Sequence, residues 1–139
     1  EVEVDRALRN RYRHDLSFRN VYVDLDDTLL LRDQVNVDLV RFIFQCHNRG
    51  IPVRLITRHA GDLQSKLTMH RLIGIFDEII HVSGDGKKSE FIQAPDAIFI
   101  DDSYSERKNV SDALGIPVFD CSMVELLTEG MSTSFQAAD

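Results

Sequence analysis

Carboxylates follow directly on two apolar segments of this sequence. Residues 21–28 read Val-Tyr-Val-Asp-Leu-Asp-Asp-Thr, so an apolar run ends in three carboxylates and a hydroxyl. Residues 98–102 repeat the arrangement as Ile-Phe-Ile-Asp-Asp. Because clustered buried carboxylates repel one another and lose solvation, they need compensation, and their hard oxygens suit Mg²⁺. Two apolar strands that deliver acids at their carboxyl ends are typical of an active site on an open α/β sheet.

The alternation of apolar patterns predicts the elements that must position these acids. Strands alternating with helices predict a parallel sheet with helices on both faces. Right-handed crossovers then place the carboxyl ends of all strands at one edge, so we expect Asp24, Thr57 and Asp101 to converge there. Strands are predicted at 21–25, 51–56, 78–82, 97–100 and 117–119, and helices at 37–49, 62–73, 88–93, 105–114 and 123–127.

The composition is that of one globular domain. The chain has 139 residues, of which 43% are hydrophobic and 28% charged, which is enough for one core and too few for two. A net charge of −7 disfavours nucleic acid or an anionic membrane as a partner. No membrane span or signal peptide is apparent, and Cys46 and Cys121 show no metal or CxxC spacing. These features predict a cytoplasmic protein with reduced thiols.

The pattern predicts three regions along the chain. Residues 1–19 are expected to form an N-terminal arm or short helix, 20–127 the domain, and 128–139 a flexible C-terminal tail. The first residue is Glu1, so the sequence leaves open whether the chain is a piece of a longer polypeptide. Fusion to another domain and assembly into a homo-oligomer are both compatible with this pattern.

Four motifs in order resemble the signature motifs of the haloacid dehalogenase (HAD) superfamily. They are Asp24-x-Asp26-x-Thr28, Thr57, Lys88 and Asp101-Asp102, and the resemblance covers residues 20–127. Most members of this superfamily are Mg²⁺-dependent phosphatases. The resemblance implies a three-layer α/β/α sandwich with a parallel Rossmann-like sheet in strand order 5-4-1-2-3. It also implies hydrolysis of a phosphate monoester through an aspartyl-phosphate.

The resemblance further implies a role for each motif residue. Asp24 would be the nucleophile and Asp26 the general acid and base. Thr57 and Lys88 would bind the transferring phosphoryl group. The residues implied as Mg²⁺ ligands are Asp24, Asp26 through its backbone carbonyl, Asp101 and Asp102. For Asp102, the interpretation leaves open a contact through water or the orientation of Lys88.

Some positions carry two interpretations on the sequence alone. Lys87 and Lys88 compete for the third motif, and Lys88 is favoured because Phe91 and Ile92 would then face inward from a short helix. Arg58 and His59 directly follow Thr57, so they either contact the substrate or belong to a solvated loop.

The spacing of the motifs leaves no room for a cap domain. Only 28 residues separate Thr28 from Thr57, and 30 separate Thr57 from Lys88. Capless relatives tend to act on large or extended substrates, or to use a neighbouring subunit or domain as a lid. Residues 29–36 are expected to form a small flap, with at least two of its three leucines in the core. The alternatives to hydrolysis are phosphoryl transfer to an acceptor other than water and a non-catalytic module of a larger biosynthetic protein.

Overall fold

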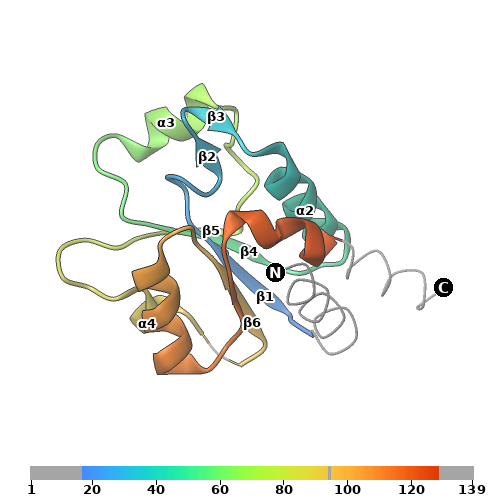
Figure 1. Cartoon of the computed structure of the whole chain (residues 1–139). Coiled ribbons are helices and arrows are strands. Elements are labelled where there is room, and N and C mark those ends of the chain that lie inside the picture. The colour runs from blue at the N-terminus through green and yellow to red at the C-terminus, as the bar shows by residue number, and fades with distance from the viewer. Residues whose placement is uncertain (1–16, 94, 129–139) are drawn as a thin grey trace.

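A five-stranded parallel sheet forms the centre of the molecule (Figure 1). The computed structural model describes residues 17–93 and 95–128. Every pair of neighbouring strands is parallel. In spatial order the strands are β5 (Glu78–His81), β4 (Val53–Thr57), β1 (Asn20–Val23), β6 (Ala97–Ile100) and β7 (Val118–Phe119). This order confirms the strand arrangement expected from the sequence.

Helices cover the two faces of the sheet, and the alternation of side chains along β1 shows how. Val21 and Val23 point to one face, where they pack with α2 (Val37–Asn48). Tyr22 points to the other face, where it joins a second apolar cluster with Val110 of α4 (Tyr104–Leu114). The two helices accordingly lie on opposite sides of the sheet in Figure 1. The three-layer α/β/α sandwich is therefore confirmed.

Local hydrogen bonds define where the main helices begin and end. The Asn36 side chain accepts from the Leu39 N–H at the start of α2, and Ser103 caps α4 in the same way. Gly50 and Gly115 follow the two helices with φ values of 72° and 69°. This left-handed conformation favours glycine, so both helices end where the sequence predicts.

Two predicted helices are shorter in the structure. The helix α3 spans Leu63–Met69 and not 62–73, because the chain leaves the helix with Arg71 at a φ of 60°. The segment predicted as a helix at 88–93 is a 3₁₀-helix, η1 (Lys88–Phe91). Ile92 is buried as expected, but the prediction for Phe91 was wrong, since its side chain is 42% exposed. Three residues per turn place neighbouring apolar residues on different faces, so both cannot point inward.

The flap next to β1 is a small antiparallel hairpin. Its strands are β2 (Leu30–Leu31) and β3 (Gln34–Val35). Leu29 and Leu30 are buried and Leu31 is partly exposed, so two of the three leucines belong to the core as predicted.

The chain between the motifs is used up by the elements of the sheet, its helices and this hairpin. No cap domain is present in residues 17–93 and 95–128, as expected. A last 3₁₀-helix, η2 (Cys121–Met123), leads into a helical turn through residue 128. Within the described part of the chain, no helix combines the length and apolarity needed to cross a membrane. The predictions for residues 1–16 and 129–139 concern segments outside the described residues.

Candidate active site

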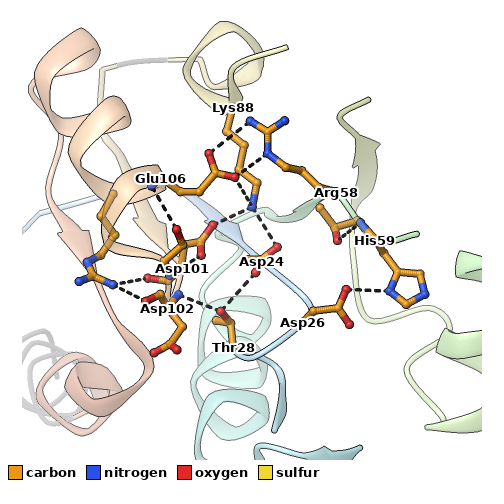
Figure 2. A network of polar contacts seen from close by, with 12 residues as sticks. Asp24, Asp26, Thr28, Arg58, His59, Lys88, Asp101, Asp102 and Glu106 are labelled. Carbon is orange, nitrogen blue, oxygen red and sulfur yellow. Dashed lines mark hydrogen bonds and ion pairs between the residues drawn. The ribbon is translucent and has the colours of Figure 1, made fainter. Parts of the chain in front are cut away.

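Lys88 joins the acids that follow two neighbouring strands. Asp24 follows β1 and Asp101 follows β6, and these strands pair directly. The Lys88 Nζ lies 2.9 Å from Asp24 Oδ1 and 2.7 Å from Asp101 Oδ2 (Figure 2). The three side chains are almost fully buried, with 2% of Lys88, 11% of Asp24 and 2% of Asp101 exposed. Lys87 is exposed, so the structure places Lys88 and not Lys87 in this cluster.

Burial controls the electrostatics of this cluster. Loss of solvation, followed by repulsion from Asp101, raises the pKa of Asp24 to about 6. Burial also raises the pKa of Asp101, although Lys88 opposes the shift. Burial works against the charge of Lys88, but Asp24 and Asp101 outweigh it and raise the pKa of the ammonium. Two carboxylates therefore share one permanent cation, and their negative charge is incompletely compensated.

Thr28 braces the loops that carry the two acids. Its Oγ1 accepts a hydrogen bond of 3.0 Å from the Asp102 N–H and lies 3.4 Å from Asp24 Oδ2. The side chain is fully buried. The loop after β1 is thus tied to the loop after β6 through the Thr28 hydroxyl.

Thr57 ends β4 beside the cluster but is covered by the chain that follows it. It is 1% exposed, and its Oγ1 accepts a hydrogen bond of 3.0 Å from the His59 N–H. Because this contact occupies a lone pair of the oxygen, the hydroxyl hydrogen remains available for donation. Thr57 does not line the open cleft described below.

Arg58 is held by Glu106, a residue that the sequence analysis missed. Its guanidinium donates through Nε to Glu106 Oε2 at 2.7 Å and through Nη2 to Oε1 at 3.3 Å. The same carboxylate lies 3.6 Å from Lys88 Nζ. The hydrogen bond from Arg58 helps to lower the pKa of Glu106 against the effect of its partial burial. The signal in the sequence was an acid in the first turn of the helix after Asp101-Asp102.

Asp26 faces away from the buried cluster and contacts His59 instead. The His59 Nδ1 lies 2.7 Å from Asp26 Oδ2, on the opposite side of the cleft from Glu106 (Figure 2). The structure thus gives His59 a contact with a proposed catalytic side chain, where the sequence left a solvated loop as an alternative.

Asp102 does not enter the cluster with its side chain. Its carboxylate contacts Cys121 Sγ at 3.5 Å, and its backbone carbonyl accepts from Arg107. Lys88 contacts Asp24, Asp101 and Glu106, so the suggested orientation of Lys88 by Asp102 is not observed. Burial raises the pKa of Cys121, which keeps this thiol in its neutral form.

These side chains surround an open cleft of about 510 Å³ at the carboxyl edge of the sheet. Asp24, Lys88 and Asp101 form its floor, and the residues that complete the lining come from two loops and the start of α4. They are Asp26, Arg58, His59, Ala60, Ser103, Ser105 and Glu106.

The donors on the floor of the cleft fit Mg²⁺. A divalent cation would supply the positive charge that Lys88 alone does not provide to Asp24 and Asp101. Mg²⁺ is commonly held by one or two carboxylates together with water and substrate phosphate. Within residues 17–93 and 95–128, no three acidic, histidine or cysteine side chains form a metal-binding group. The floor of the cleft therefore does not provide a complete set of protein ligands for a metal ion.

Comparison with known proteins identifies the fold through structure alone. No family model matches the sequence, and no curated protein sequence matches it. The structure resembles 3-deoxy-D-manno-octulosonate 8-phosphate phosphatase from Moraxella catarrhalis, solved in complex with magnesium, phosphate and KDO. The TM-score is 0.54 at 12% identity, over 95% of this chain and 97% of that one.

Two further structures agree. A HAD-superfamily hydrolase from Ehrlichia chaffeensis matches with a TM-score of 0.54 at 16% identity, over 94% of this chain and 75% of that one. The core domain of a candidate phosphoglycolate phosphatase from Streptococcus pneumoniae matches with a TM-score of 0.54 at 17% identity, over 74% of this chain and 79% of that one. The chain therefore has a HAD-like fold, as the motifs predicted.

Proposed function

We propose that this protein is a Mg²⁺-dependent phosphohydrolase that cleaves phosphate monoesters through an aspartyl-phosphate on Asp24. The observation that carries the proposal is the buried cluster of Asp24, Lys88 and Asp101 at the floor of an open cleft. The names of the HAD-like structures that it resembles support the same class of reaction.

In this mechanism the chain positions the reacting groups and moves the proton. Asp24 attacks phosphorus while Lys88 balances charge on the phosphoryl oxygens. Asp26 protonates the leaving oxygen and then removes a proton from the water that attacks the aspartyl-phosphate. Thr57 would donate its hydroxyl hydrogen to the phosphoryl group, which requires the segment at His59 that covers it to shift. When bound by Asp24 and Asp101, Mg²⁺ would neutralise charge on the phosphate, with the Asp26 backbone carbonyl as a further ligand.

The test is phosphate release from a panel of phosphorylated sugars, nucleotides, phosphopeptides and aryl phosphates with and without Mg²⁺. Asp24→Asn should reduce kcat by at least about 1000-fold, because loss of a nucleophile of this kind typically has effects of that order. Asp27→Asn is the matched control on the same loop, because Asp27 is exposed and asparagine tolerates its φ of 62°. Full activity of Asp24→Asn would contradict the covalent mechanism.

The same assay separates hydrolysis from phosphoryl transfer. Added alcohols or sugars should not divert the phosphoryl group if water is the natural acceptor. Because no cap covers the cleft in the described residues, we propose that large or extended phosphorylated substrates are accepted. A steep loss of kcat/KM with increasing substrate size would contradict that part of the proposal.

A further inference from the structure

We propose that His59 is a positioning residue that holds the Asp26 carboxylate in place for proton transfer. The inference rests on the proposed function of Asp26 and adds a residue whose role the motifs do not state. Its basis is the contact of 2.7 Å between His59 Nδ1 and Asp26 Oδ2, within a network that fixes the histidine from both sides.

The backbone of His59 is anchored by hydrogen bonds at both its N–H and its carbonyl. Its N–H donates to Thr57 Oγ1 at 3.0 Å, and its carbonyl accepts from His81 Nε2 at 2.8 Å. Thr57 and His81 end the paired strands β4 and β5 and are aligned in register. The imidazole therefore projects from a loop tied to two strands, although the loop lies at the surface.

The exposure of the two side chains shows which one needs the other. The Asp26 side chain is 48% exposed, whereas the His59 side chain is only 14% exposed. A half-exposed carboxylate on a short loop can rotate freely, and a fixed donor restricts it to one orientation. Near-attack geometry depends on such restriction, and small displacements reduce rates strongly.

The direction of the hydrogen bond defines which oxygen remains for chemistry. Oδ2 of Asp26 accepts a hydrogen bond both when the carboxyl group is ionised and when its proton lies on Oδ1, so Nδ1 carries the proton in this contact. His59 then occupies Oδ2 of Asp26 and leaves Oδ1 as the atom that exchanges a proton with the leaving oxygen or with water. Both residues line the cleft in which the phosphate ester would bind.

The first experiment compares three substitutions of His59. His59→Ala should lower kcat about 10- to 100-fold with KM changed less than about threefold, since the lost step is proton transfer and not binding. His59→Asn should recover much of the loss, because its amide N–H₂ lies near the position of Nδ1. His59→Gln should not, because its amide reaches toward the position of Nε2. Equal activity of the Asn and Gln variants, or an unchanged kcat in the Ala variant, would overturn the inference.

The leaving group and a double variant show whether His59 acts through Asp26. The loss in His59→Ala should be larger for alkyl phosphates than for dinitrophenyl phosphate, whose leaving group needs little protonation. In the Asp26→Asn background, His59→Ala should cause no further loss, because the residue it positions is no longer an acid. Additive losses would mean that His59 acts independently of Asp26.

A spectroscopic measurement separates failure of this inference from failure of the proposed function. Nitrogen-15 NMR of the wild-type imidazole should show a proton on Nδ1 of His59, and Asp26→Asn should change that signal. A signal that Asp26→Asn does not alter would overturn the inference even in an active enzyme. A wild-type protein that hydrolyses no phosphate ester would instead overturn the proposed function, and the NMR signal would still decide whether His59 holds Asp26.

Discussion

The charge of the site depends on a balance within three residues. Lys88 offers one positive charge to two buried carboxylates, Asp24 and Asp101, with Glu106 close behind. Removing one member of such a buried group leaves the others uncompensated, which usually destabilises a protein far more than losing a surface ion pair.

Lys88→Met should therefore lower the free energy of unfolding by about 3–5 kcal/mol at neutral pH. Lys87→Met is the matched control and should change it by less than about 0.5 kcal/mol, because Lys87 is exposed. Urea unfolding measures both. The destabilisation of Lys88→Met should shrink near pH 5, where the carboxylates bind protons. A loss independent of pH would contradict this electrostatic explanation.

Asp24 should give the Mg²⁺-free protein a characteristic dependence on pH. Its folded-state pKa of about 6 lies above the ordinary value of 3.8, so the protonated form favours the folded state. The stabilisation is present in full below about pH 4 and is lost as the pH rises through 6. Between these limits the wild type should lose on the order of 3 kcal/mol that Asp24→Asn retains. Parallel stability curves from urea unfolding in EDTA would contradict the shift.

At the scale of elements, the site depends on how loops from distant strands are joined. Thr28 accepts from the Asp102 N–H and so connects the loops after β1 and β6. Lys88 also links these loops through Asp24 and Asp101, so the Thr28 hydroxyl adds a second side-chain connection.

Thr28→Val keeps the volume of the side chain but removes its hydroxyl. The Asp102 N–H would lose its part-buried acceptor, which costs about 0.5–1.5 kcal/mol of stability. Thr68→Val is the control, because its hydroxyl donates to the Gln64 carbonyl on the exposed surface of α3. Hydrogen exchange should show faster exchange of the Asp102 amide in Thr28→Val alone. Unchanged exchange would mean that the loop is held by other contacts.

At the scale of the whole molecule, the sheet brings acids from distant parts of the sequence to one edge, and a bound cation should stabilise the entire fold. Mg²⁺ at 100 times its Kd would add about 2.7 kcal/mol to the free energy of unfolding. The melting temperature should rise by several degrees at pH 7.5 and by less at pH 5, where Asp24 is largely protonated. Asp101→Asn should remove most of the increase, and an equal increase in that variant would place the cation elsewhere.

Local patterns in the sequence determined the elements and the ends of the strands. Apolar runs of strand length and the glycines at 50 and 115 are properties of neighbouring residues, and the structure confirms the strands and the two helices that these glycines follow. The handedness of crossovers then sufficed to predict that Asp24 and Asp101 lie at the same edge.

Only the tertiary structure decided which partners the polar side chains take. The sequence favoured Lys88 over Lys87, although the inward position expected for Phe91 was wrong. The contact of Glu106 with Arg58 and that of His59 with Asp26 had no counterpart in the local pattern. The physical reason is the large sequence separation between the residues that make these contacts. Periodicity reports which face of its own element a side chain occupies, whereas a hydrogen bond across dozens of residues depends on how loops pack. The 3₁₀-helix at Lys88–Phe91 is too short for its periodicity to predict which of its side chains point inward.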